Sequence, residues 1–244
     1  MNAVQVQNYD YSGEGVVLLI DKSIDWTSFD VVKKVRALFN VRKVGHAGTL
    51  DPKATGLLIV CTGKQTKCIE QFVGLEKEYT GTMKLGVRTP SFDLETEVSE
   101  SMDYSSITSQ QVIETANLFL GKQSQLPPMY SAVKYGGKPL YRYARSGRTV
   151  ERAEREINVV HFDIRQIYFP YVDFSITCSK GTYIRSLIDS YGLRLGCGAT
   201  VTALRRVRIG GHVVSNAQTI QQLTEWRNSI VNQGQEQHET SAIH

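Results

Sequence analysis

One short stretch, residues 45–52, places tight limits on how the chain around it can fold. It reads Gly-His-Ala-Gly-Thr-Leu-Asp-Pro. Its two glycines permit backbone conformations with positive φ, and Pro52 has a fixed φ that pushes Asp51 toward an extended conformation. The apolar run at 55–61 follows at once and is typical of a buried strand. A single carboxylate on a stiff loop beside a buried strand suits a nucleophile, although an Asp-Pro pair also commonly starts a plain turn.

The bulk properties of the chain are those of an ordinary globular protein. Its 244 residues suffice for one large domain, or for a domain with a small appendage. An apolar fraction of 41% and a charged fraction of 21% are both typical. The four cysteines form no CxxC pair and have no histidine cluster beside them, so we expect neither a metal site nor a disulfide. Nothing approaches the roughly 18 continuous apolar residues of a membrane span.

Strand and helix patterns are mixed without a steady βαβ alternation, which favours an α+β fold. Two residue pairs, Thr27 with Asp30 and Thr108 with Gln111, have the spacing of capping boxes at helix starts. The expected strands are residues 15–20, 55–61, 77–87, 157–167 and 171–178, with further strand and loop residues at 200–214. The other expected helices are residues 63–74, 182–195 and 220–231.

Three further expectations concern segments between and beyond these elements. The helix that follows Thr108 is expected to end at Gly121, with Leu120 on its buried side. Residues 89–100 are rich in Ser, Thr and acidic residues and are expected to form a loop. Residues 232–244 are polar and low in aliphatic side chains, so we expect them to be disordered.

Positive charge is concentrated at residues 134–155, which hold seven basic residues and two acids. The formal net charge of the whole chain is only +4, so the remainder is close to neutral. Three tyrosines stand among the basic residues, and glycines 136, 137 and 147 interrupt any long helix. One interpretation is a solvated charged loop. The other is a nucleic-acid clamp, in which Lys and Arg neutralise phosphates and tyrosine rings stack on unpaired bases.

The motif at 45–52 resembles the catalytic motif of TruB-type tRNA pseudouridine synthases. Five further segments resemble motifs of that family in the same order, and the matches run from about 15 to about 211. These segments are 15–22 (Gly-Val-Val-Leu-Leu-Ile-Asp-Lys), 77–79 (Lys-Glu-Tyr), 125–134 (Gln-Leu-Pro-Pro-Met-Tyr-Ser-Ala-Val-Lys), 178–185 (Cys-Ser-Lys-Gly-Thr-Tyr-Ile-Arg) and 204–206 (Leu-Arg-Arg).

The resemblance implies a pseudouridine-synthase fold, an α+β architecture with a central, mostly antiparallel mixed sheet flanked by helices. It implies a flexible lead-in at 1–14 and a catalytic domain at 15–215, with an RNA-clamping insertion at about 125–156. Residues 216–244 would then form a short C-terminal helix and a polar tail. Many family members continue into a PUA domain that touches the acceptor end of tRNA, and no complete PUA domain is expected here.

The resemblance also implies an activity, the isomerisation of uridine 55 in the T loop of tRNA to pseudouridine. Asp51 would be the nucleophile, attacking the ribose C1′ or the uracil C6, unless a sugar proton is removed first. Arg185 would keep Asp51 ionised and oriented, and Tyr79 would stack under the uracil. The reaction adds and removes no atoms, so no cofactor and no metal are expected. The T arm of tRNA is the expected partner, with no membrane and no obligate protein partner, in the cytoplasm.

Other residues receive binding roles by the same resemblance. His46 would fill the gap left in the T loop when the enzyme extrudes its target base. Leu204 would cap the pocket, Lys22 would support the base of the catalytic loop, and Asp93 would have a supporting role near the active site. The residues expected to contact RNA or substrate through positive charge are Lys134, Arg142, Arg145 and Arg206.

Two other readings compete with catalysis on uridine. A non-catalytic tRNA-binding or RNA-folding module could use the same clamp, although intact Asp51, Tyr79 and Arg185 argue against binding alone. A hydrolase with an aspartate nucleophile that acts on a small glycoside would be expected to need a second carboxylate at suitable spacing. The catalytic motif offers no such carboxylate.

Overall fold

The computed structural model describes residues 10–241, and the chain divides into two compact units. The first unit holds the residues up to Gly74 together with those from Val207 onward, and the second is Leu75–Arg206. Most of the lead-in expected at 1–14 lies outside the described residues, and 10–14 form a turn. Within the described part of the chain, no helix combines the length and apolar character needed to cross a bilayer.

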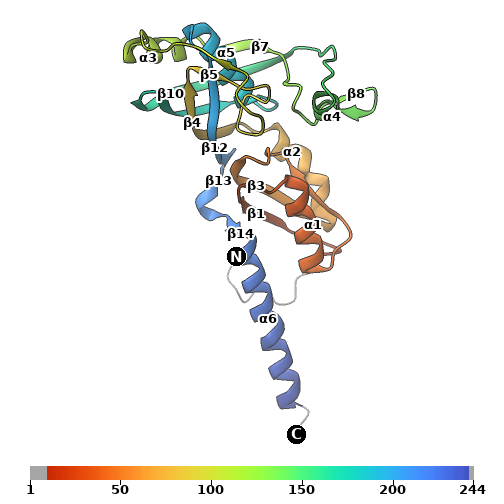
Figure 1. Cartoon of the computed structure of the whole chain (residues 1–244). Coiled ribbons are helices and arrows are strands. Elements are labelled where there is room, and N and C mark those ends of the chain that lie inside the picture. The colour runs from red at the N-terminus through yellow and green to blue at the C-terminus, as the bar shows by residue number, and fades with distance from the viewer. Residues whose placement is uncertain (1–9, 242–244) are drawn as a thin grey trace. The chain divides into compact units, whose positions relative to one another are not determined.

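The strands β1, β2, β3 and β14 form the main part of the first unit. β1 (Val17–Lys22) and β3 (Ala54–Thr62) pair antiparallel, β2 (Val44–Ala47) pairs antiparallel with β3, and β14 (Gln218–Thr219) pairs parallel with β1. A 3₁₀ helix, Gly63–Cys68, leads into α2 (Ile69–Gly74). Both α2 and α1 (Ser28–Phe39) pack on β2, in the red-to-orange part of Figure 1. One cluster in the core of this unit is formed by Ala47, Leu57, Ile59, Cys61 and Ile209.

The second unit has the strand order β12-β4-β11-β10-β7. β12 (Ala199–Ile209) lies next to β4 (Lys77–Leu85). β4 pairs antiparallel with β11 (Tyr171–Cys178), and β11 pairs antiparallel with β10 (Arg155–Tyr168). β10 in turn pairs antiparallel with β7 (Gly121–Gln125). Helices α3 (Ser109–Asn117) and α5 (Ile184–Leu195) contact each other, and the Tyr191 hydroxyl donates to the Val112 carbonyl at 2.7 Å.

The remaining elements are short. β5 (Val87–Arg88) pairs with β6 (Glu100–Ser101), and β13 (His212–Val213) pairs with the end of β12 before a 3₁₀ turn at Val214–Asn216. The expected insertion contains a hairpin, β8 (Lys134–Tyr135) with β9 (Lys138–Pro139), followed by α4 (Leu140–Arg145). In Figure 1, α4 and β8 stand apart from the strands of their unit, at the end of long connections from β7 and to β10.

The α+β prediction is confirmed, since strand pairing is mostly antiparallel, β14 pairs parallel with β1, and helices flank the strands. Both predicted capping boxes are present. The Thr27 and Thr108 side chains accept from the N–H groups of Asp30 and Gln111, whose side chains accept from the cap N–H groups in return. These reciprocal bonds satisfy donors that a helix start otherwise leaves free, so the sequence spacing located both starts.

Several boundaries differ from the expectations. β1 begins at Val17 and extends to Lys22, and the strands β2 and β7 were not predicted. Leu120 is exposed rather than buried, because α3 ends at Asn117 and Gly121 turns the chain with φ +89° into β7. The last helix, α6 (Ile220–Ser241), continues well past 231, so the expectation of disorder from 232 was wrong for the backbone up to Ser241.

Candidate active site

Asp51 lies in the connection between β2 and β3, and the loop begins at a glycine with an unusual backbone conformation. Gly48 has φ +86°, a conformation that favours glycine. Gly45 does not have positive φ, so that part of the prediction was wrong. A Cβ on Gly45 would instead come within 2.7 Å of the Ile69 side chain. His46 lies on β2 opposite Val60, so the first three residues of the motif, 45–47, are strand rather than loop.

The loop that carries Asp51 is bound to the segment before and within α1. The Ser28 hydroxyl accepts from the Leu50 N–H at 2.9 Å and lies 3.2 Å from the Leu50 carbonyl. The Asp51 carbonyl accepts from the Ala54 N–H at 3.1 Å, and the Pro52 carbonyl accepts from the Asp25 N–H at 2.9 Å. The backbone on both sides of Asp51 is therefore held by hydrogen bonds, which restricts where its carboxylate can lie.

Lys22 contacts the segments on both sides of this loop through its ammonium group. Its side chain is 0% exposed, and a buried ammonium requires hydrogen-bond acceptors. Lys22 Nζ donates to the Trp26 carbonyl at 2.6 Å and to the Ser23 carbonyl at 3.0 Å, and it lies 3.5 Å from the Pro52 carbonyl. One lysine thus joins the end of β1 to the residue after Asp51.

In the second unit, Arg185 near the start of α5 is only 2% exposed. Its Nη1 donates to the Ser91 carbonyl at 2.6 Å and its Nη2 to the Tyr130 carbonyl at 2.9 Å. Its Nε lies 3.5 Å from Oδ2 of Asp93, which is 4% exposed. A buried guanidinium with a carboxylate and two carbonyls is oriented tightly, since each contact fixes a different part of its planar group.

The loop that presents Asp93 is stabilised by its own side chains. The Thr89 hydroxyl donates to the Asp93 carbonyl at 2.8 Å, and Asp93 Oδ1 accepts from the Glu95 N–H at 2.9 Å. Ser91 and Thr96 bond each other through their hydroxyls at 2.8 Å. Phe92 has φ +64°, in a region that non-glycine residues rarely adopt. The surrounding bonds hold this strained turn, and Asp93 is placed by it against Arg185.

Tyr79 lies on β4 opposite Ile176 and is 9% exposed. Lys77 is buried on the same face of the strand, two residues earlier, and donates to the Leu75 carbonyl at 2.6 Å. Burial, followed by the nearby Arg206 charge, lowers the pKa of Lys77 to about 8. Leu204 and Arg206 are both buried on β12, and Arg206 is only 1% exposed. Its guanidinium therefore lies within the protein, close enough to act on Lys77, rather than at the surface.

The basic insertion combines exposed cations with aromatic rings. Lys134 and Arg142 are exposed. The Arg145 guanidinium carbon lies 5.4 Å from the centre of the Tyr141 ring, and Arg145 Nη2 forms an ion pair with Glu95 Oε1 at 2.9 Å. The insertion thus has the interleaved charges and rings that the sequence indicated, but one of its arginines already holds a carboxylate.

The predicted site residues fall into two groups. His46, Asp51 and Lys22 belong to the first unit, and Tyr79, Asp93, Arg185, Leu204, Arg206 and the basic insertion belong to the second. The structure brings Arg185 and Asp93 together, a pair that the sequence did not predict. It also reveals supporting groups that motif reading missed, the Ser28 hydroxyl and the carbonyls of Ser91 and Tyr130. Every residue has a backbone carbonyl, so the sequence could not indicate that those of Ser91 and Tyr130 would bind Arg185.

Chemically, the first unit offers one carboxylate on a restrained loop, and the second offers a buried guanidinium and a tyrosine. Among the residues that the structure describes, no group of three or more His, Cys, Asp or Glu side chains is placed to hold a metal ion. The site residues are those of covalent and acid–base chemistry.

Two family models together match most of the chain. The TruB family pseudouridylate synthase N-terminal domain matches residues 36–184, and the tRNA pseudouridylate synthase B C-terminal domain matches residues 185–239. A protein from Chloroherpeton thalassium named tRNA pseudouridine synthase B is 49% identical over 87% of this chain and 90% of its own length. A protein of the same name from Flavobacterium johnsoniae is 46% identical over 84% of this chain and 92% of its own.

Solved structures give a consistent result for the fold. The chain is similar, with a TM-score of 0.68 and 30% identity over 86% of its length, to a chain in the crystal structure of a Cbf5–Nop10–Gar1 complex. It is also similar, with a TM-score of 0.67 and 26% identity, to a chain of an H/ACA RNP bound to a substrate RNA containing 2′-deoxyuridine. The chain spans about half the length of these two relatives, 53% and 55%.

Proposed function

The chain belongs to the TruB family of pseudouridylate synthases, and from that membership we propose that it converts uridine 55 in the T loop of tRNA to pseudouridine. It is a tRNA pseudouridine synthase, an isomerase, and its reaction moves uracil from an N-glycosidic to a C-glycosidic link on the same ribose. We place its catalytic domain at 15–215 and its activity in the cytoplasm. The T arm is the proposed partner.

The observation that carries this proposal is the restrained loop around Asp51. Ser28 holds the backbone of Leu50, and Ala54 and Asp25 hold the carbonyls of Asp51 and Pro52. In our proposal the Asp51 carboxylate attacks the extruded nucleoside, at the ribose C1′ or the uracil C6, and is later released as the C-glycosidic bond forms. A carboxylate can serve covalently because it both attacks and leaves, and a fixed loop lowers the entropy lost on reaching the reactive geometry.

The roles of the other site residues follow from the same proposal. In this proposal Arg185 is the cationic partner of the Asp51 carboxylate during the reaction, and the position of Arg185 is set by Asp93, Ser91 and Tyr130. His46 on β2 fills the gap that the extruded base leaves in the T loop, which offsets an unstacking cost of a few kcal/mol. Leu204 forms an apolar wall beside the base.

The test is direct. Purified protein is incubated with an unmodified tRNA transcript, and pseudouridine is mapped along the RNA. Product at position 55 alone is the expected result. Product at another position would reject the assignment of substrate, and absence of product with intact RNA binding would favour a non-catalytic RNA-binding module.

Tyr79→Phe tests the second role of the tyrosine. The phenyl ring keeps the stacking surface under the uracil but removes the hydroxyl that we propose mediates a proton transfer at carbon. We expect single-turnover pseudouridine formation to slow by about 10²-fold, with the Kd for tRNA unchanged. A wild-type rate in this variant would leave Tyr79 with stacking alone.

Arg142→Ala and Arg145→Ala test the clamp, and the structure predicts which of them weakens tRNA binding more. Arg142 is exposed, whereas Arg145 exchanges Glu95 for a phosphate if it binds RNA. We expect Arg142→Ala to weaken tRNA binding and to reduce the slope of log K against log[salt] by about 1. Arg145→Ala should change the slope less. Arg165→Ala removes an exposed charge on β10 and is the matched control. Equal slopes in all three variants and the wild type would contradict the clamp.

A further inference from the structure

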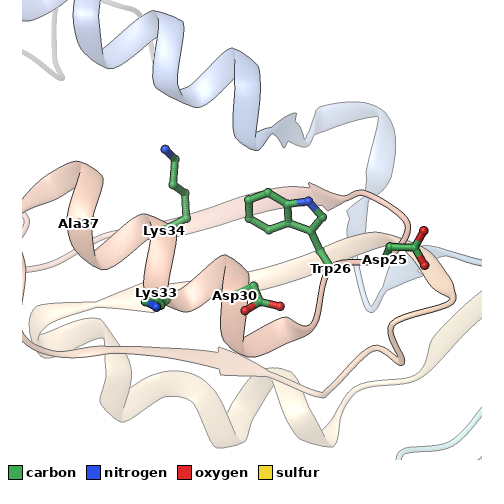
Figure 2. Close-up of a pocket in the computed structure, with 6 residues that line it drawn as sticks. All are labelled: Asp25, Trp26, Asp30, Lys33, Lys34 and Ala37. Atoms are coloured by element: carbon green, nitrogen blue, oxygen red, sulfur yellow. The ribbon is translucent and has the colours of Figure 1, made fainter.

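A recess lies in the first unit, at the start of α1 (Figure 2). Its volume is about 400 Å³, which is in the range of sites that hold small ligands or parts of larger ones. Figure 2 shows the Trp26 indole and the extended Lys34 side chain on the same side of the chain, with the Asp25 carboxylate pointing away from the indole. The lining residues are Asp25, Trp26, Asp30, Lys33, Lys34 and Ala37.

The two acids of this recess are engaged by the protein itself. Asp25 Oδ1 accepts from Lys53 Nζ at 2.7 Å. Asp30 Oδ2 accepts from both the N–H and the hydroxyl of Thr27, at 3.0 and 2.6 Å, as part of the α1 capping box. Those hydrogen bonds lower the pKa of Asp30, and it stays ionised as a structural group.

The cations of the recess are placed differently. Lys33 and Lys34 are exposed on α1. With Lys53 included, positive side chains outnumber negative ones around the recess. The recess therefore combines ammonium groups that reach solvent with one flat aromatic ring, the half-buried indole of Trp26. Single-stranded RNA is commonly bound by this combination, since bases stack on aromatic rings and phosphates pair with lysines.

The segment that lines the recess also supports the catalytic loop. The Trp26 carbonyl accepts from Lys22 Nζ at 2.6 Å, and the Asp25 N–H donates to the Pro52 carbonyl at 2.9 Å. A ligand on the Trp26 ring would thus contact the backbone segment that holds the residue next to Asp51. Binding of a ligand at Trp26 would thus further restrict the loop that carries Asp51, in addition to increasing the affinity for the ligand.

We propose that this recess binds one unpaired nucleotide of the substrate tRNA other than the one that reacts, with its base on Trp26 and its phosphate at Lys33 and Lys34. The proposal rests on the proposed function, since it takes RNA as the substrate. It assigns to the start of α1 an RNA contact that is separate from the basic insertion.

The experiment uses the chain's two tryptophans. Trp226→Phe, in α6, leaves Trp26 as the only indole and keeps a ring in the position 6.2 Å from Phe39. An unmodified tRNA transcript is titrated into this variant. We expect quenching of Trp26 emission that saturates at the same RNA concentration as binding measured on filters. Quenching by uridine monophosphate at those concentrations would instead make the recess a site for free nucleotides and overturn the RNA assignment.

A charge-reversed pair tests the lysines. Lys33→Glu with Lys34→Glu should lower tRNA affinity at least about tenfold near 0.1 M salt and abolish the quenching. Arg36→Glu makes the same kind of change on the same helix at a residue that does not line the recess, and should have a much smaller effect per charge. Equal effects per charge would show general electrostatics and overturn the proposal, and this comparison stands even if Trp226→Phe fails to fold.

The outcomes for the recess and for the proposed function are separable. If the Trp226→Phe protein forms pseudouridine without any change in Trp26 emission on addition of tRNA, the recess proposal is rejected and the proposed function stands. RNA-dependent quenching without pseudouridine would support the recess and reject the catalytic assignment.

Discussion

Replacing Asp51 by asparagine is expected to abolish pseudouridine formation while leaving tRNA binding intact. Asparagine has the shape of aspartate, so the bonds of the surrounding loop, which use the backbone of Leu50, Asp51 and Pro52, are preserved. Its amide cannot act as the nucleophile, and loss of a covalent nucleophile costs about four or more orders of magnitude in rate. Single-turnover assays with a tRNA transcript measure the rate, and filter binding measures Kd.

The matched control is Asp163→Asn, the same chemical change at an exposed position on β10. It should retain the wild-type rate. Turnover by Asp51→Asn within tenfold of the control would reject Asp51 as the nucleophile. A large rise in Kd would mean that the carboxylate, or the loop around it, contributes mainly to binding.

The second large effect is on stability. Arg185→Met is expected to lower the free energy of unfolding by about 3–5 kcal/mol, because it leaves the buried Asp93 carboxylate without its cation. It also removes the donor from the carbonyls of Ser91 and Tyr130. Urea denaturation provides the measurement, with the m-value checked so that a change in midpoint reports stability alone.

Arg194→Met on the same helix is the control, since Arg194 is exposed and its loss should cost no more than about 0.5 kcal/mol. Adding Asp93→Asn to Arg185→Met should recover part of the loss, because the amide carries no charge. A double-mutant cycle isolates this coupling. Equal destabilisation by Arg185→Met and Arg194→Met would contradict the buried ion pair.

Sequence reasoning succeeded where local chemistry decides the structure. The capping pairs at Thr27 and Thr108 located two helix starts, since a side chain four residues or fewer away completes each motif. The apolar run at 55–61 correctly indicated β3, whose side chains are nearly all buried. Glycines 136, 137 and 147 were expected to interrupt any long helix, and with positive φ they stand beside a short hairpin and a six-residue helix, α4.

Sequence reasoning failed where contacts between distant parts of the chain determine the local structure. β2 was read as loop because Gly45 resembles a turn residue, yet Gly45 lies on a strand that is defined by its pairing with β3 and packs close to the end of the Ile69 side chain. β7, with the sequence Gly-Lys-Gln-Ser-Gln, has no apolar alternation and is a strand only through its pairing with β10. The contacts of Arg185 with the carbonyls of Ser91 and Tyr130 are equally invisible in residue types.

In the proposed RNA clamp, the ion pair between Arg145 and Glu95 would affect selectivity among RNAs. Glu95 also donates its backbone N–H to Asp93, the buried neighbour of Arg185. A phosphate that takes Arg145 must first displace a carboxylate, so that single exchange brings little net gain. We therefore expect weaker binding of polyanions that contact Arg145 alone, whereas an RNA that contacts several basic residues at once would overcome this competition. An internal carboxylate that competes with phosphate would thus allow a positively charged surface to distinguish RNAs by their shape, without any contact to a base.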